Sequence, residues 1–131
     1  MVTLTHEATF DSDIDSVWAI IGDPAGVPQW FTGVESATVV DGLRTCVLRR
    51  GPVVTERIVE IDNVSHRFSY SIVDGFPVTS HLGTVDLVEY GSGCRLLYTT
   101  QVTPDSFGDG LGRSIDVALT TLRELVDEPS R

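Results

Sequence analysis

Three residues in segments of strand-like composition could take part in proton transfer: Glu56, His81 and Tyr98. A carboxylate, an imidazole and a phenol can act as general acids and bases. Dehydration or aldol cyclisation needs little beyond positioned proton transfer in a site that excludes water. The same groups can also hold a hydroxyl or carbonyl group of a bound molecule without reacting with it. The residue types therefore leave two uses open, catalysis and binding.

Alternation of apolar side chains predicts which polar residues face the core. Successive side chains of a strand point to opposite faces, so a polar residue two positions from large apolar residues shares their buried face. Small residues on that face would underfill a close-packed core and indicate a cavity. The set predicted to point inward is Tyr70, Ile72, His81, Gly83, Tyr98 and Thr100.

The segment 53–61 is different, because both of its faces are partly apolar. Glu56 and Arg57 point opposite ways on any strand, but alternation does not decide which of them is inward. The direction of Glu56 stays open on the residues alone.

Other motifs for chemistry are incomplete. The glycine-rich segment 108–113 lacks the third glycine of a phosphate loop, and Asp109 within it would repel phosphate. No histidine or cysteine pair has metal-ligand spacing, and no serine lies in a nucleophile elbow. Cys46 and Cys94 are expected to be free thiols. We expect neither a metal nor a cofactor.

The charge composition limits the classes of molecule that the protein is expected to bind. The chain has nine basic and 19 acidic residues, so its net charge is −10, and all nine basic residues are arginine. A chain without lysine has no amine for a Schiff base or a P-loop, and an acidic chain lacks the clustered cations that bind nucleic acid or anionic membranes. No apolar run approaches the roughly 18 residues of a membrane span, and the first residues do not resemble a secretory signal. These features predict a cytoplasmic protein without membrane insertion.

The first quarter of the chain predicts one strand and two short helices. Residues 3–10 alternate as in a strand. Ser12 and Asp15 have the spacing of a capping box, which predicts that a helix starts there. The segment 24–31 is short and rich in glycine and proline, which predicts one or two helical turns.

The rest of the chain predicts six strands and a long helix. Between residues 34 and 102, short β-branched runs alternate with turn signals, of which Asp41-Gly42 is typical of a two-residue hairpin. A final helix is expected over about 110–127, with an apolar stripe from Leu111 to Leu125. The order predicts a single α+β domain over 1–131. It would be a curved seven-stranded antiparallel sheet wrapped around a long C-terminal helix, with two short helices between strands 1 and 2.

The order and spacing of several short motifs resemble one superfamily. The motifs are Val17-Trp18, Trp30-Phe31-Thr32-Gly33-Val34, Thr55-Glu56-Arg57-Ile58 followed by Asp62, Phe68-Ser69-Tyr70-Ser71-Ile72, Gly83-Thr84-Val85, and Tyr98 ahead of Pro104. On these residues, which span nearly the whole chain, the sequence resembles the helix-grip START-like (SRPBCC) proteins. They include lipid-transfer domains, bacterial polyketide cyclase/dehydrase and lipid transport-like proteins, birch pollen allergen relatives and plant abscisic acid receptors. The bacterial cyclase-like branch is the most similar.

This resemblance implies a hydrophobic cavity between the sheet and the C-terminal helix. It places Glu56 inward and Arg57 outward, and it places the segments 50–52 and 75–77 at the mouth. The hormone receptors carry a lysine that anchors a ligand carboxylate, whereas this chain has Phe31. The residues implied to contact a ligand are Trp30, Phe31, Glu56, Tyr70, Ile72, Phe76, His81, Tyr98, Val117 and Thr121.

The first functional expectation is binding without turnover. The ligand would be a small hydrophobic molecule of lipid, polyketide or isoprenoid type, bound by a monomer or a homodimer. The cations expected near it are His81, with Arg50 and Arg113 at the mouth. In the absence of lysine, these few cations favour a neutral or hydroxylated ligand.

Two alternatives remain open at this point. The chain could be a polyketide aromatase/cyclase or a dehydratase that uses Glu56, His81 or Tyr98 as acid or base. It could instead dock a partner through its acidic surface, with the cavity closed by Trp30, Tyr70 and Tyr98. The superfamily hosts both enzymes and binding proteins, so the fold alone does not decide between these functions.

Overall fold

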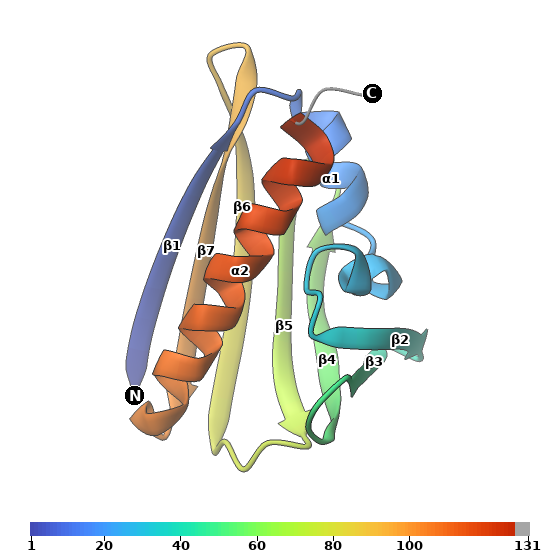
Figure 1. The fold of residues 1–131 in the computed structure, drawn as a ribbon, viewed down its shortest axis with the longest axis vertical. Helices are drawn as coiled ribbons and strands as arrows, with labels where there is room; N and C mark the ends of the chain where they lie inside the picture. Colours follow the sequence, from blue (N-terminus) through green and yellow to red (C-terminus); the bar gives the residue numbers. More distant parts are fainter. Residues whose placement is uncertain (128–131) are drawn as a thin grey trace.

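The computed structural model describes residues 1–127, whose arrangement is shown in Figure 1. Within this range seven strands form one sheet, accompanied by two α-helices and two 3-10 helices. In chain order the elements are β1 (Val2–Phe10), α1 (Ile14–Ile21), η1 (Pro24–Gln29), β2 (Val34–Val40), β3 (Leu43–Leu48), β4 (Val53–Asp62), β5 (Arg67–Asp74), β6 (Ser80–Tyr90), β7 (Gly93–Thr103), η2 (Asp105–Phe107) and α2 (Gly108–Asp127).

The sheet has the strand order β1-β7-β6-β5-β4-β3-β2, and every neighbouring pair is antiparallel. Consecutive strands β1 and β2 are therefore its two edges, and α1 and η1 make the connection between them. Helix α2 runs obliquely across one face of the sheet (Figure 1). The predicted fold is confirmed: a seven-stranded curved antiparallel sheet with a long C-terminal helix and two short helices after the first strand.

The β2–β3 hairpin turns at Asp41 and Gly42. Their φ angles are 52° and 76°, so both residues lie in the left-handed region that a tight hairpin turn requires. Aspartate and glycine tolerate this region better than most residues, because glycine has no Cβ and the short aspartate side chain is polar. The turn predicted at this dipeptide is confirmed, and it fixes the pairing of β2 with β3.

The start of α1 differs from the prediction. Asp13, not Ser12, caps the helix, since its carboxylate accepts the N–H of Ser16 at 2.8 Å. The Ser12 hydroxyl instead donates to the carbonyl oxygen of Val126 at 2.5 Å and to Oδ1 of Asp127 at 2.9 Å. Tertiary contact with the end of α2 has displaced the local capping pattern.

Helix α2 buries one stripe against the sheet. Ile115, Ala118, Leu119 and Leu122 are buried, whereas Leu125 is 49% exposed. The stripe continues four residues after Leu122, at Val126, which packs on the core. The prediction that Leu125 belongs to it was wrong, since Val126 and not Leu125 follows Leu122 on the buried face. No helix within residues 1–127 is long and apolar enough to cross a membrane.

The core is divided into two clusters. The larger one joins α1 and the C-terminal part of α2 to β1, β5, β6 and β7, with Trp18, Leu87 and Leu122 among its members. The smaller one joins η1 to β2, β3, β4 and β5, and α2 contributes only the half-buried Leu111 to it. The N-terminal half of α2 therefore does not pack closely on the sheet beneath it, and this is where the fold is hollow.

Candidate functional site

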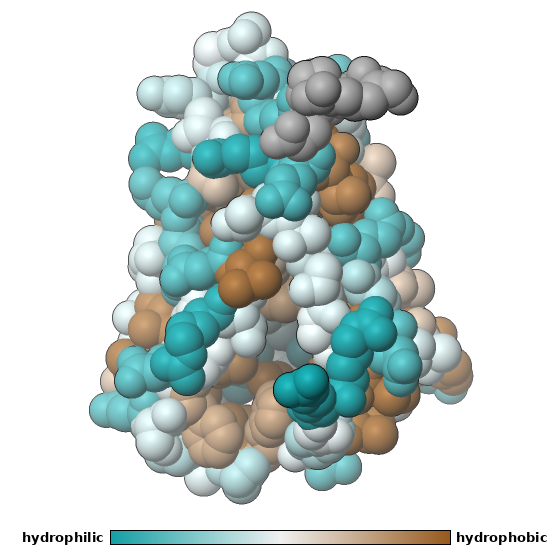
Figure 2. Space-filling model, in the orientation of Figure 1, coloured by the Kyte–Doolittle hydropathy of each residue, from teal (hydrophilic) through white to brown (hydrophobic). Residues whose placement is uncertain are grey.

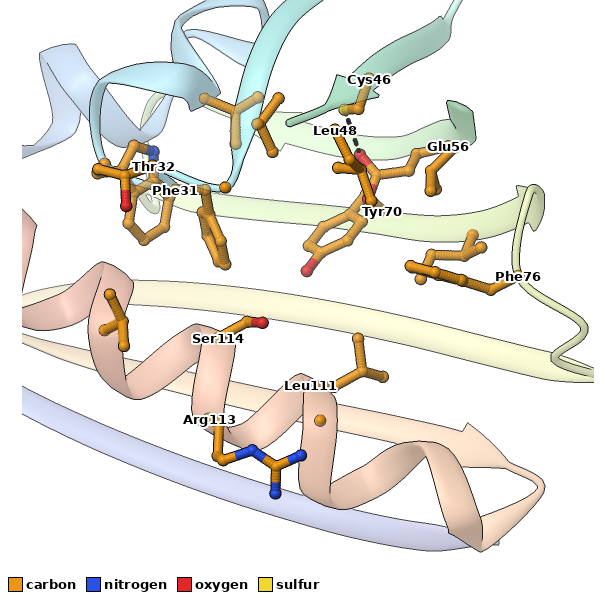
Figure 3. A pocket seen from close by; sticks show the side chains of 18 of the residues that line it. Phe31, Thr32, Cys46, Leu48, Glu56, Tyr70, Phe76, Leu111, Arg113 and Ser114 are labelled. Carbon is orange, nitrogen blue, oxygen red and sulfur yellow. Dashed lines mark hydrogen bonds between the residues drawn. The ribbon is translucent and has the colours of Figure 1, made fainter. Parts of the chain in front are cut away.

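A cavity of about 910 Å³ lies between the sheet and the N-terminal half of α2. Strands β2 to β7 line one side, and η1, η2 and α2 line the other. Figure 2 shows the surface hollowed beside the lower half of α2, and Figure 3 shows side chains from the strands and the helix around the hollow. Ligand pockets typically span roughly 300–1,000 Å³, so the space is large enough for a small organic molecule.

Aromatic and aliphatic side chains form much of the wall. Trp30 and Phe31 follow η1, and their ring centroids are 4.7 Å apart in an edge-on arrangement. Phe31 also lies edge-on to Tyr98 at 6.3 Å. Leu111 reaches in from α2 (Figure 3), and Val117, 57% exposed, lies at the rim. These side chains offer apolar surface to a ligand.

A buried ion pair lies in the wall formed by β3 and β4. The strand register places Arg44 directly opposite Glu56, and Nε of Arg44 donates to Oε1 of Glu56 at 2.7 Å. Only 4% of Arg44 and 9% of Glu56 are exposed. The guanidinium also donates to the carbonyl oxygen of Pro24 at 3.1 Å and lies over the Phe68 and Tyr70 rings, 5.3 and 5.2 Å from their centroids. These contacts offset the cost of removing two charges from water.

Cys46 lies on the same face of β3 as Arg44. Its thiol donates to Oε1 of Glu56 at 3.6 Å, the hydrogen bond drawn in Figure 3. Burial and the negative charge of Glu56 raise the pKa of the Cys46 thiol to about 12. The thiol is therefore protonated at neutral pH and is a poor nucleophile.

Two tyrosines meet in the middle of the sheet. The hydroxyls of Tyr70 and Tyr98 are hydrogen-bonded to each other, and burial raises the pKa of both phenols. The ring of Tyr70 lies over Gly83, where a Cβ would come within 2.6 Å of a ring carbon. Gly83 is therefore the residue that makes room for Tyr70 on this face. Both phenols are protonated at neutral pH and can donate hydrogen bonds.

The charges that line the cavity cancel. Arg44 and Glu56 pair in the interior, while the remaining charged residues lie around η1, the β3–β4 turn and the start of α2. Although the chain as a whole has a net charge of −10, the lining has none. Three basic and three acidic residues make up this set: Arg44, Arg50, Arg113, Asp23, Glu56 and Asp109.

The structure places His81 outside the cavity lining. The imidazole is buried, and its Nδ1 accepts the backbone N–H of Ile72 at 3.0 Å. The β5–β6 pairing extends only as far as Tyr70 and Gly83, so the ring takes the place of a strand partner for Ile72. Burial lowers the pKa of His81 to about 4, which leaves the imidazole neutral at pH 7. Its position indicates a role in joining two strands.

Thr121 also lies outside the lining. It is half-buried on α2, one turn after Val117, and its hydroxyl donates to the carbonyl oxygen of Val117 at 3.1 Å. The other residues expected to contact a ligand are brought together around the cavity. They are Trp30, Phe31, Glu56, Tyr70, Ile72, Phe76, Tyr98 and Val117.

Sequence reasoning missed the β3 side of the cavity. Arg44, Cys46 and Leu48 alternate along β3 and all line the space, but none of them was predicted there. The buried cysteine was the available signal, since Arg44 lies two positions before it and must share its face. Ser114 of α2 was missed as well, and Figure 3 shows its hydroxyl directed toward the cavity.

Within residues 1–127, no cluster of three or more histidine, cysteine, aspartate or glutamate side chains is arranged to hold a metal ion. The polar groups that line the cavity are hydroxyls, a thiol, the paired Arg44 and Glu56, and four exposed charged side chains, Arg50, Arg113, Asp23 and Asp109. The site can donate and accept hydrogen bonds in an otherwise apolar space.

A helix-grip sheet closed by a C-terminal helix over a cavity defines the START-like (SRPBCC) class of proteins. Residues 1–127 match the family described as polyketide cyclase / dehydrase and lipid transport, and the chain belongs to this family. No curated protein sequence matches the chain. The family and the fold are consistent with hydrophobic ligand binding or with polyketide cyclase-like roles.

Solved structures with a similar fold share little sequence with this chain. The XoxI protein of Bacillus cereus is 20% identical, with 96% of each chain covered and a TM-score of 0.90. Truncated norcoclaurine synthase of Thalictrum flavum is 18% identical over 98% of this chain and 95% of its own, with a TM-score of 0.78. A START superfamily protein of Mycobacterium smegmatis is 12% identical over 95% and 96%, with a TM-score of 0.80. At these identities the similarity establishes the fold alone.

Proposed function

We propose that this protein binds a small, largely apolar and uncharged molecule in the cavity between the sheet and α2. The observation that carries the proposal is a mostly apolar cavity of about 910 Å³ whose lining has equal numbers of basic and acidic residues. Arg50, Arg113, Asp23 and Asp109 are exposed, so a full charge placed in the buried part of the cavity would give up its hydration and meet Arg44 and Glu56, which are already paired with each other. A neutral ligand that buries about 200 Å² of apolar surface would gain roughly 5 kcal/mol at about 25 cal/mol per Å², before the costs of association.

The positions of the acid and base candidates favour binding over turnover. His81 lies outside the lining, is neutral at pH 7 and is already hydrogen-bonded to Ile72. Within residues 1–127 no hydrogen bond joins its imidazole to Glu56. Tyr98 and Tyr70 are hydrogen-bonded to each other, and burial raises the pKa of both phenols, so both are weak acids at neutral pH. A cyclase or dehydratase activity would have to rely on Glu56 without the histidine.

An interaction-only protein with a closed cavity is also less well supported. The rings of Trp30, Tyr70 and Tyr98 were expected to fill the space in that case. They lie in the cavity wall instead and leave about 910 Å³ open.

The proposal is tested with the neutral fluorescent probe N-phenyl-1-naphthylamine. The wild-type protein should give a saturable increase in its fluorescence. Ser114→Trp places an indole in the cavity from an exposed helix position and should weaken binding at least tenfold. Glu124→Trp, an exposed position of the same helix outside the lining, is the control and should bind as the wild type does. Absence of saturable binding, or equal binding by both variants, would overturn the proposal.

A further inference from the structure

Glu56 presents an unused hydrogen-bond acceptor in the cavity wall. Its Oε1 receives both Nε of Arg44 and the thiol of Cys46. Within residues 1–127 no hydrogen bond reaches the second carboxylate oxygen, Oε2. The residue is 9% exposed and belongs to the cavity lining. Oε2 is not among the fully buried side-chain atoms that lack a partner within residues 1–127, so it remains open to the cavity, where water or a ligand can bind it.

The rest of the ion pair holds this oxygen in place. Arg44 is fixed by Glu56, by the carbonyl oxygen of Pro24 and by the two rings over which it lies. Its side chain is 5% exposed and that of Glu56 is 12% exposed, so the carboxylate is the part of the pair that is more open to a ligand. Arg44 therefore acts as a positioning residue that orients Glu56.

The neighbouring polar groups do not compete for the same ligand atom. The hydroxyls of Tyr70 and Tyr98 bind each other, and the Cys46 thiol is bound to Oε1. An apolar molecule that covered Glu56 would separate Oε2 from water and leave it unpaired, which is costly for a charged group. A molecule with an O–H or N–H group would replace the lost water.

We infer that Glu56 selects ligands that carry a hydrogen-bond donor, such as a phenol, an enol or an N–H group on an apolar skeleton, and that Oε2 accepts this donor. The inference rests on the proposed function, since it concerns the same cavity. Ethers, esters and hydrocarbons of the same shape should bind more weakly, because they offer no proton to the carboxylate.

The inference is tested with two probes that differ in one donor, 2-naphthol and 2-methoxynaphthalene, each used to displace N-phenyl-1-naphthylamine. The wild type should bind 2-naphthol at least about tenfold more tightly, as expected for a hydrogen bond to a charged acceptor. In Glu56→Gln the amide carbonyl can still accept from Arg44, which turns the NH₂ group toward the cavity. The preference should then fall to threefold or less. Glu60→Gln, an exposed position on the same strand, removes the same charge and should keep the wild-type ratio.

The outcomes separate this inference from the proposed function. If both probes displace the fluorophore from the wild type within twofold of each other, the cavity binds ligands but Glu56 does not select donors. If Glu56→Gln keeps the tenfold preference for 2-naphthol, another residue accepts the hydrogen bond of the ligand and the inference is wrong. If neither probe nor the fluorophore binds, the proposed function fails and this inference fails with it. The wild-type ratio needs no variant, so poor folding of Glu56→Gln would not remove the test.

Discussion

Arg44 and Glu56 face each other across β3 and β4, with Nε and Oε1 2.7 Å apart in the wall of the cavity. The pair contributes a charge-neutral polar patch to an otherwise apolar space, and it leaves one carboxylate oxygen open. Neither residue could have this role alone, since an unpaired charge at either position would be buried without a partner. The pair therefore links the stability of this edge of the sheet to the chemistry of the site.

Breaking the pair should cost more than removing it. Arg44→Met leaves Glu56 buried without its cation, so we expect a loss of about 3–5 kcal/mol in the free energy of unfolding. The double variant Arg44→Met/Glu56→Leu replaces both charges with apolar groups and should lose less than the sum of the two single variants. Urea unfolding of the four proteins measures this coupling.

An exposed ion pair serves as the control for this cycle. Arg67 and Asp86 are also 2.7 Å apart, but their side chains are 47% and 28% exposed. Because water screens such a pair, Arg67→Met should change stability much less than Arg44→Met does. Equal losses at the two sites would contradict the importance assigned to the buried pair.

The sequence was sufficient for the sheet and the helices because their signals are local. Alternation and the Asp41-Gly42 turn predict the strands, and a step of three to four residues predicts α2. The burial of Arg44 is not a local property, because it depends on a partner in the next strand and on the carbonyl oxygen of Pro24.

His81 shows the second limit of sequence reasoning. Alternation correctly placed its side chain on the inner face of the sheet, where it is buried. It could not show which part of that face the cavity occupies, since this depends on where α2 crosses the sheet. The same holds for Thr121, one turn beyond the last cavity-lining residue of α2.

Gly83 should not tolerate a side chain. A Cβ there would lie 2.6 Å from the Tyr70 ring, so Gly83→Ala must displace the tyrosine and should cost about 1–3 kcal/mol. The displaced ring would also break the hydrogen bond to Tyr98 and narrow the cavity. Gly33→Ala, where a Cβ meets nothing within 4 Å, is the matched control and should be nearly neutral. Thermal unfolding compares the two, and equal melting temperatures would refute the close approach.

The two cysteines should be unreactive in the folded protein. Burial raises the pKa of Cys46 to about 12 and that of Cys94 to about 11, and neither residue is more than 3% exposed. At pH 8 we therefore expect no reaction of either thiol with Ellman's reagent within minutes, and reaction of both after unfolding in guanidinium chloride. Ser36→Cys, at an exposed position of β2, supplies one fast thiol as a positive control. Rapid reaction of a thiol in the wild type would contradict this prediction. It would show that the cavity wall opens near Cys46 or that the start of β7 unfolds locally near Cys94.

The neutral, buried His81 should make stability depend on pH. Its pKa is lowered from 6.5 to about 4 by burial, so between these values the unfolded chain binds a proton that the folded protein does not. The contribution of the neutral ring is therefore complete above pH 6.5 and is lost progressively as the pH falls toward 4. His81→Asn keeps an acceptor for the N–H of Ile72 but removes the titration.

The difference in unfolding free energy between wild type and His81→Asn isolates this effect from the carboxylates, which titrate in both proteins. That difference should shrink as the pH falls from 7 to 4.5, with a slope approaching about 1.4 kcal/mol per pH unit in the middle of the window. Urea unfolding at pH 7, 6, 5 and 4.5 measures it. A difference that stays constant over this range would show that the imidazole titrates alike in the folded and unfolded chains, and the strand-joining role assigned to neutral His81 would then be wrong.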